Sequence, residues 1–300
     1  MMPPNICAVC AIGRMDRASC AVSMEDAMAA VEVRRQEEGI VRVLQISDCH
    51  LFDDPDGRLL GVDTRQSFAA VVEAVKKQAW PADFVLVTGD ISQDFSAGSY
   101  ERFASIISAL GKPVFFIPGN HDDGPLEYRI FERLGVSVSK HVICGGWQFV
   151  LLNSEVYSQA HGWVQRWDLE HLRRSAEKRP ELCTCAAIHH LPCLVDSRWL
   201  DTQTLHNFDE FQAYVRRIPS VRLVLSGHVH QEFDRMVGPV RYIASPSTSI
   251  QFMPGSAEFE LDVRAPGWRT LTLGDDGTIS TKVYRLASGQ FVPNYSARGY

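Results

Sequence analysis

Carboxylates, imidazoles and an amide follow five apolar runs of this 300-residue chain, each at the point where a run ends. Six of the ten histidines lie in these polar groups. Burying such side chains costs free energy unless something pairs with them, so their position indicates a shared chemical task. In chain order the groups are Asp48-Cys49-His50, Gly89-Asp90, Gly119-Asn120-His121-Asp122, His189-His190 and Gly227-His228-Val229-His230.

The spacing within the groups suits a metal site. Asp48 and His50 are two residues apart, as are His228 and His230, so in an extended chain each pair points to one side. A glycine precedes three of the groups, which allows a tight turn or a close approach to a ligand. Four neutral imidazoles, two carboxylates and an amide oxygen would hold two divalent transition-metal ions. Water between two such ions is a source of hydroxide near neutral pH.

Each motif by itself has an ordinary structural interpretation. A lone Asp-x-His is most often a turn or a capped helix start, and Gly-Asp alone means little. The pair His189-His190 is equally expected of partly buried histidines beside a carboxylate. Five such motifs in order, each at a strand end, favour the metal interpretation.

Strand-like and helix-like segments alternate along the chain, which predicts an α/β fold. After Phe233 the pattern changes to hairpin strands, with a turn at 274–277. In open α/β sheets, ligands bind beyond the carboxyl ends of the strands, where the polar groups lie. Strands are expected at 41–48, 84–90, 113–120, 147–154, 183–190, 221–230, 241–247, 259–263, 268–273 and 280–286, and helices at 63–78, 99–110 and 163–178.

Composition excludes some function classes. The net charge is −6 without a basic block, which argues against a partner such as nucleic acid or a membrane surface. No apolar run approaches the roughly 18 residues of a transmembrane helix. Of the eight cysteines, Cys144, Cys183 and Cys185 lie in apolar stretches, and no secretory signal opens the chain, so a reducing cytoplasmic location is expected. Three other cysteines, Cys7, Cys10 and Cys20, resemble half a zinc site without a fourth ligand.

Residues 1–40 are expected to be an N-terminal extension, partly disordered, and residues 41–300 a single domain. The segment 25–38 has the pattern of a short amphipathic helix or tail. Met24 or Met28 is an alternative start of the protein.

The ordered set of motifs resembles the calcineurin-like metallophosphoesterase superfamily. Further blocks resemble the bacterial class III cyclic nucleotide phosphodiesterases, which hydrolyse 3′,5′-cyclic AMP. This resemblance covers roughly residues 41–300 and implies a four-layer αββα sandwich, with two mixed β-sheets flanked by helices. The blocks are QISDCHLF, LLGVDTRQSF, TGDISQD, PGNHD, SRWLD, LSGHVHQEFD, PSTSIQF and APGWRTL.

The resemblance also implies the metal ligands. One ion would be held by Asp48, His50, Asp90 and His230, and the other by Asp90, Asn120, His189 and His228. Asp90 is then the bridge, and His189 is chosen over His190 because it directly ends the apolar run. Iron, manganese or both are typical of the family, while the residue types also permit zinc or cobalt.

The implied reaction is in-line attack of a metal-bridging hydroxide on a cyclic nucleotide, a small-molecule substrate, with 5′-AMP as product. Asn120 and His121 would contact the phosphate, and His121, as imidazolium, would stabilise or protonate the leaving oxygen. Asp122 is expected to orient the His121 ring. The alternative role of His121 is a structural hydrogen bond that closes its loop.

Other activities of the same superfamily use the same ligands. They include nucleotide pyrophosphatases, phosphomonoesterases, protein phosphatases and broad cyclic nucleotide hydrolases, and the C-terminal blocks favour the cyclic AMP enzymes over them. A non-catalytic scaffold is disfavoured because all seven ligand positions and His121 are intact. Thr248 and Gln251 are weak candidates for contacts with the base or ribose, equally expected as loop-structural residues.

Overall fold

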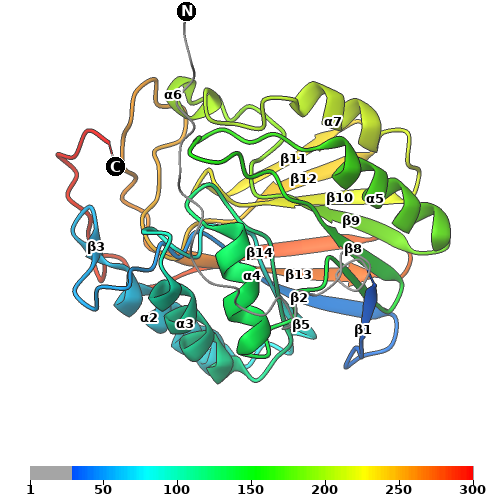
Figure 1. Ribbon diagram of the computed structural model, residues 1–300, viewed down its shortest axis with the longest axis horizontal. Helices are drawn as coiled ribbons and strands as arrows, with labels where there is room; N and C mark the ends of the chain where they lie inside the picture. Colours follow the sequence, from blue (N-terminus) through cyan, green and yellow to red (C-terminus); the bar gives the residue numbers. More distant parts are fainter. Residues whose placement is uncertain (1–28, 300) are drawn as a thin grey trace, which may run out of the picture.

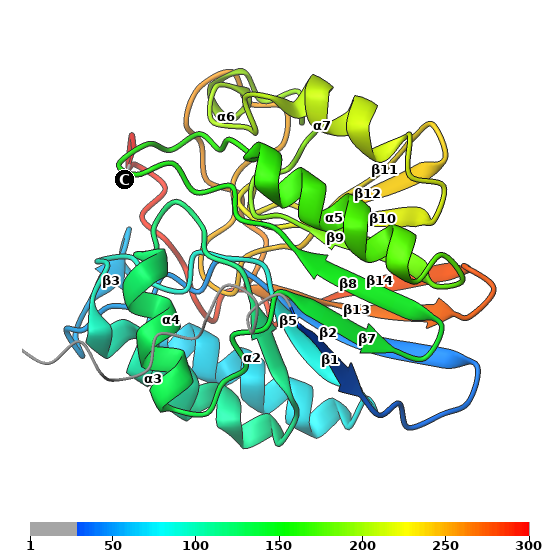
Figure 2. The ribbon, with the colours of Figure 1, turned by 45° about the vertical axis from the view of Figure 1, so that its right-hand side comes forward.

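Two β-sheets stack face to face, and helices cover the outer face of each, as Figures 1 and 2 show. This computed structural model describes residues 29–299. The first sheet contains, in spatial order, β1 (Ala30–Val33), β7 (His141–Cys144), β8 (Trp147–Leu151), β9 (Cys183–Ala187), β10 (Val221–Ser226), β12 (Val240–Ala244) and β11 (Phe233–Val237). The second contains β14 (Ile279–Arg285), β13 (Gly267–Gly274), β2 (Ile40–Ile46), β5 (Phe84–Val87) and β6 (Val114–Phe116). Both sheets mix parallel and antiparallel pairs, so the predicted fold is confirmed.

The helices form the two outer layers (Figure 1). The second sheet is covered by α2 (Thr64–Gln78), α3 (Ala97–Ile107) and α4 (Gly124–Arg133), and the first by α5 (Arg166–Lys178) and α7 (Phe208–Val215). Smaller elements are the hairpin of β3 (Arg58–Leu59) and β4 (Val62–Asp63), the 3₁₀ turn η1 (Ser108–Leu110) and α6 (Arg198–Asp201). None of the helices in residues 29–299 combines the length and apolarity needed to span a bilayer.

The alternation of side chains along the strands produces three apolar layers. On β2, Val41 and Val43 belong to the cluster between the sheets, whereas Leu44 and Ile46 belong to the cluster under the helices of the second sheet. Successive side chains of a strand point to opposite faces, so a central strand must be apolar on both. The third cluster lies between the first sheet and α5 and α7.

Parallel pairing brings the polar groups to one edge. In the second sheet, β2, β5 and β6 are parallel neighbours, and in the first sheet β8, β9 and β10 are parallel neighbours. Their carboxyl ends therefore open at the same side of the sandwich, where the five predicted motifs begin.

Some local predictions are wrong. Within 25–38, where a helix was expected, Ala30–Val33 form strand β1, which pairs in parallel with β7. This places four residues of the expected extension in the first sheet, since pairing with an available sheet edge outweighs a weak helical preference. The expected strand at 259–263 is reduced to an isolated bridge between Phe252 and Leu261. The predictions for Cys7, Cys10, Cys20, Met24 and Met28, and for disorder in 1–28, fall outside the described residues.

Candidate metal centre

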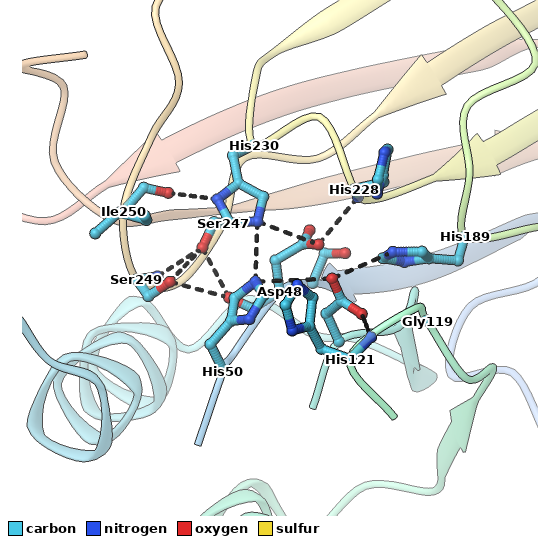
Figure 3. Close-up of polar contacts among 12 residues, drawn as sticks. Asp48, His50, Gly119, His121, His189, His228, His230, Ser247, Ser249 and Ile250 are labelled. Carbon is cyan, nitrogen blue, oxygen red and sulfur yellow. Dashed lines mark hydrogen bonds and ion pairs between the residues drawn. The ribbon is translucent and has the colours of Figure 1, made fainter. Parts of the chain in front are cut away.

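All eight predicted site residues lie together at the carboxyl ends of β2, β5, β6, β9 and β10. In Figure 3 the labelled imidazoles and Asp48 point toward a common centre, although they come from segments far apart in the chain. Most of these side chains are buried, and Asn120 and His121 are partly exposed. The convergence depends on both sheets, because the first supplies His189, His228 and His230 while the second supplies the others.

Five of the predicted ligands have left-handed backbone conformations. Their φ values are 54° at Asp48, 48° at His50, 52° at Asp90, 67° at His228 and 48° at His230. Such conformations are uncommon for residues other than glycine and cost on the order of 1–3 kcal/mol each. Backbone hydrogen bonds maintain them: the Asp48 amide donates to the Gly89 carbonyl (3.0 Å) and the His50 amide to the Asp90 carbonyl (2.9 Å). Strain that is held in this way is typical of functional sites.

Two glycines allow the loops to approach one another. A Cβ atom at Gly119 would overlap the carboxylate and backbone nitrogen of Asp90, and one at Gly227 would overlap the Ser47 hydroxyl. Glycine at these two positions therefore permits a close approach between loops of the protein itself, whereas the sequence prediction concerned a tight turn or an approach to a ligand.

The ring nitrogens of His50 and His230 identify one cation site. The Nδ1 of His230 lies 2.9 Å from the Ile250 carbonyl, and the Nδ1 of His50 lies 2.7 Å from Gln93 Oε1. These oxygens only accept hydrogen bonds, so both Nδ1 atoms donate and both Nε2 atoms carry lone pairs. The two Nε2 atoms nevertheless face each other at 3.0 Å. Two lone pairs at this distance repel each other unless a proton or a metal ion lies between them, and Asp48 Oδ1 lies 3.5 Å from the His230 Nε2, so these three side chains could hold an ion.

A second group of acceptors surrounds His189. Its Nδ1 donates to the Thr88 carbonyl at 2.7 Å, so in the neutral ring its Nε2 is an acceptor. This Nε2 lies 3.3 Å from Asp90 Oδ2 and 3.2 Å from Asn120 Oδ1, which are also acceptors. The same Asn120 oxygen is 3.0 Å from Nδ1 of His228.

Buried atoms without a hydrogen-bond partner also indicate a metal site. Asp48 Oδ2 and His228 Nε2 are buried without a hydrogen-bond partner. Buried polar atoms are almost always paired, so each of these two ligand-type atoms requires an explanation. Donor atoms close enough to share an ion occur in the sets Asp48–His50–His230, Asp48–Asp90–His189, His50–Asp90–His121 and His189–His190–His228. The imidazole and carboxylate donors present thus fit divalent metal ions.

The electrostatics of the site keep its carboxylates ionised. Burial alone would raise the pKa of Asp90, but His189, His121 and His50 hold it well below its usual range. Burial would lower the pKa of His189, yet Asp90 and Asp48 raise it to about 9. Burial lowers the pKa of His50 to about 3, so this imidazole is neutral and available as a ligand.

His189 and His190 have different surroundings. The Nδ1 of His190 lies 2.8 Å from the Ser154 hydroxyl, and its ring packs 4.6 Å from that of His228. Its Nε2 is buried without a hydrogen-bond partner. Since the Nε2 of His189 faces Asp90 directly, the geometry supports the choice of His189 as the ligand.

The neighbours of His121 differ in part from expectation. Its backbone amide donates to Asp90 Oδ1 (2.8 Å), and its ring lies 5.1 Å from that of His50. The carboxylate of Asp122 instead accepts the backbone amides of Ser92 and Gly119, both at 2.9 Å. It therefore ties the loops together rather than orienting the His121 ring. Burial also lowers the pKa of His121, so the expected imidazolium needs the negative charge of a bound phosphate.

The segment 245–252 contacts two residues of the site, Asp48 and His230, through hydrogen bonds. The hydroxyl of Ser247 donates to the Asp48 carbonyl at 2.7 Å, and Ile250 supplies the carbonyl that orients His230. Thr248 and Gln251 are fully buried, and Gln251 donates to two carbonyls of its own loop, so both are loop-structural. The sequence analysis gave no role to Ser247 and Ile250, because a hydrogen bond that involves a main-chain carbonyl requires no recognisable residue pattern.

Residues 41–232 match the model of the calcineurin-like phosphoesterases. The chain belongs to this family. It is 44% identical over 264 residues to the 3′,5′-cyclic adenosine monophosphate phosphodiesterase CpdA of Vibrio vulnificus, covering 88% of this chain and 96% of the relative. It is 41% identical, with the same coverage, to the protein of that name from Escherichia coli.

A solved structure shares the fold at low sequence identity. The purple acid phosphatase PPD1 of yellow lupin matches with a TM-score of 0.60 and 12% identity, over 86% of this chain and 53% of that one. The sandwich described above is therefore the fold of this family, and divalent metals are the cofactors of its members.

Proposed function

We propose that this protein hydrolyses 3′,5′-cyclic AMP to 5′-AMP with two divalent metal ions. The observation that carries the proposal is the likeness to cyclic AMP phosphodiesterases across almost their whole length, motifs and C-terminal blocks together. The convergence of buried acceptors at the strand ends supports it, since a phosphodiesterase needs positive charge there. A cytoplasmic location and a small-molecule cyclic nucleotide as the partner are part of the proposal.

The proposed ligands follow the two groups of acceptors. Asp48, His50 and His230 would hold one ion, and Asn120, His189 and His228 the other, with Asp90 shared. We propose iron or manganese as the metals. Bound ions would supply positive charge to the phosphate oxygens and lower the pKa of the attacking water.

The residues of the chain then have separate tasks. Asn120 and His121 are the partly exposed members of the site, so they are the side chains that a substrate phosphate reaches first. The His121 backbone is fixed by its hydrogen bond to Asp90, which aims the ring at the centre. Its imidazole would donate a proton to the leaving 3′ oxygen, and the negative phosphate would favour the protonated form.

Hydrolysis of 3′,5′-cyclic AMP by the metal-loaded protein tests the proposal, with bis(p-nitrophenyl) phosphate assayed in parallel and a chelator control. Cleavage of both substrates, abolished by the chelator and restored by manganese, is the expected result. Cleavage of the artificial diester alone would retain the metal site but refute the cyclic nucleotide as substrate. It would favour another metallophosphoesterase activity.

A further inference from the structure

Two cavities adjoin the metal centre, and both are bordered by Phe95, Asn120 and Ser158. One has a volume of about 480 Å³ and also contains His121, the proposed proton donor. The other has a volume of about 690 Å³. Both volumes are in the range of roughly 300–1,000 Å³ found for small-molecule sites. A cyclic nucleotide whose phosphate is at the metals would place its base in one of them.

The walls of the two cavities differ in chemistry. The cavity at His121 is lined by aromatic rings and by side-chain amides, namely those of Phe95, Trp199, Phe259, Gln159 and Gln203. The other cavity is lined by the acidic side chains of Asp122, Asp123 and Glu155, together with Asn153, Val156 and Tyr157. A carboxylate accepts hydrogen bonds and donates none unless it is protonated, whereas the edges of adenine present three ring acceptors and one donor group. Amides offer both a donor and an acceptor, so the cavity at His121 is the better match.

Phe95 is held in an unusual conformation at the entrance of this cavity. Its φ is 57°, a rare value for a bulky residue, and its ring is 48% exposed. The ring lies 6.4 Å from that of His121, with an angle of 25° between their planes. Exposing an aromatic ring in a strained backbone has no packing benefit. A flat ligand that stacks on this exposed apolar ring would account for both the strained backbone and the exposure.

The loop around Phe95 is anchored on both sides. The backbone amide of Gln93 donates to the Leu51 carbonyl at 2.8 Å, and the Asp94 carboxylate accepts a hydrogen bond from the backbone amide of Asp53, also at 2.8 Å. The side chain of Gln93 also orients His50 of the metal centre. The position of the Phe95 ring is therefore coupled to that of the metal centre.

The opposite wall is anchored as well. Trp199 packs on Phe252 and Phe259, with ring centroids 5.0 Å and 5.2 Å apart. Phe252 in turn stacks on His230 at 4.3 Å. Both aromatic walls of the cavity are thus attached to residues that belong to the metal centre.

We infer that this cavity is the nucleobase site, in which Phe95 is the stacking platform and the amides of Gln203 and Gln159 read the edge of adenine. The inference rests on the proposed function and adds the residues that determine specificity. A side-chain amide matches the adjacent donor and acceptor of adenine at N6 and N7. Guanine presents two acceptors there, so one of its atoms would stay unpaired. The protein should therefore prefer cyclic AMP over cyclic GMP.

The Phe95→Ala variant tests the platform. Stacking of a base on an aromatic ring is typically strong enough that kcat/KM for cyclic AMP should fall about 10- to 100-fold, mainly through KM. Activity toward methyl p-nitrophenyl phosphate, which has no base, should stay within about twofold. Because Phe95 is exposed, its truncation should leave the fold intact, and Phe95→Tyr should retain cyclic AMP hydrolysis. Equal kcat/KM for cyclic AMP in the wild type and Phe95→Ala would overturn the platform.

Tyr157→Ala is the matched control because this aromatic side chain is 90% exposed and borders only the carboxylate-lined cavity of the two. It should leave the hydrolysis of both substrates unchanged. A loss of cyclic AMP hydrolysis in this variant, with Phe95→Ala unaffected, would place the base in the other cavity.

The Gln203→Leu and Gln159→Leu variants test the reading of the base. At least one of them should lower the preference for cyclic AMP over cyclic GMP by about fivefold or more. An unchanged preference in both would refute the role of the amides. Wild-type protein that cleaves methyl p-nitrophenyl phosphate but not cyclic AMP would refute the proposed function itself, a result distinct from the failures above.

Discussion

Two buried groups of ionisable side chains in this molecule respond to burial in opposite ways. In the metal centre, imidazoles keep the pKa of Asp90 well below its usual range although burial alone would raise it. In a second group, formed by Glu127, Lys140, Glu155 and Asp168, burial dominates. It raises the pKa of Glu155 to about 7 and that of Asp168 to about 6, and it lowers the pKa of Lys140 to about 8.

The difference lies in how the donor atoms are arranged. Within residues 29–299, every group of donors close enough to share an ion belongs to the strand ends of the metal centre. In the second group the ammonium of Lys140 lies over the Tyr128 ring at 4.2 Å, and both Glu127 oxygens lack hydrogen bonds. Burial of charge is tolerated where opposite charges converge, and elsewhere burial shifts the pKa values toward the neutral forms. Burial alone therefore does not identify a metal site.

The largest expected effect comes from removing the shared carboxylate. Asp90→Asn keeps the shape of the side chain but removes the charge that His189, His121 and His50 face. Turnover should fall by at least about a thousandfold, and both ions should be lost. Metal analysis of the purified variant, together with kcat, checks this. A variant with two bound ions and near-normal kcat would contradict the bridging role.

His121→Ala separates proton donation from metal binding. We expect kcat to fall by about 10²–10⁴-fold with the metal content unchanged, since the ring is placed to act on the leaving group. Because its donor atom lies near those of His50 and Asp90, the alternative is a role as ligand. Loss of metal in His121→Ala would establish that alternative.

The pKa of His189 predicts a pH dependence of metal binding. Although burial lowers it, Asp90 raises this pKa to about 9, so the metal-free protein carries a proton on His189 at about pH 7. An ion at Nε2 must displace this proton. Metal affinity should therefore rise with pH, by up to about tenfold per unit, until about pH 9. Calorimetry in buffers of different ionisation enthalpy should detect the release of about one proton.

The matched variants His189→Asn and His190→Asn identify the source of that proton. Release should disappear in His189→Asn and persist in His190→Asn, because His190 faces Ser154. The reverse result would make His190 the ligand.

The smallest effect is expected in the second group. Burial raises the pKa of Glu127 well above its usual range and so favours the protonated carboxyl, which Glu127→Gln imitates in charge and shape. The free energy of unfolding should change by less than about 1 kcal/mol, and kcat by less than about twofold. Denaturant unfolding measures the first quantity. A loss of several kcal/mol would show that Glu127 is ionised and paired with Lys140.

Most of the fold was predictable because it follows from local patterns. The apolar run before Asp48 predicts β2, and the periodicity of 63–78 predicts α2 almost to the residue. The helix Phe208–Val215 was not predicted, because its eight residues carry too short a periodic pattern. Strand Ala30–Val33 was mistaken for helix, because its pairing partner lies more than a hundred residues away.

The sequence by itself determined which side chains are candidates for the metal centre, because residue type and position at a strand end are local properties. Only the tertiary structure decided how they are used. The direction of each imidazole depends on distant carbonyls, such as Thr88 for His189 and Ile250 for His230. The role of Asp122 and the cavity beside Phe95 likewise depend on loops that meet only when the two sheets stack. Contacts between such distant loops produce no regular residue spacing that could be recognised in the sequence.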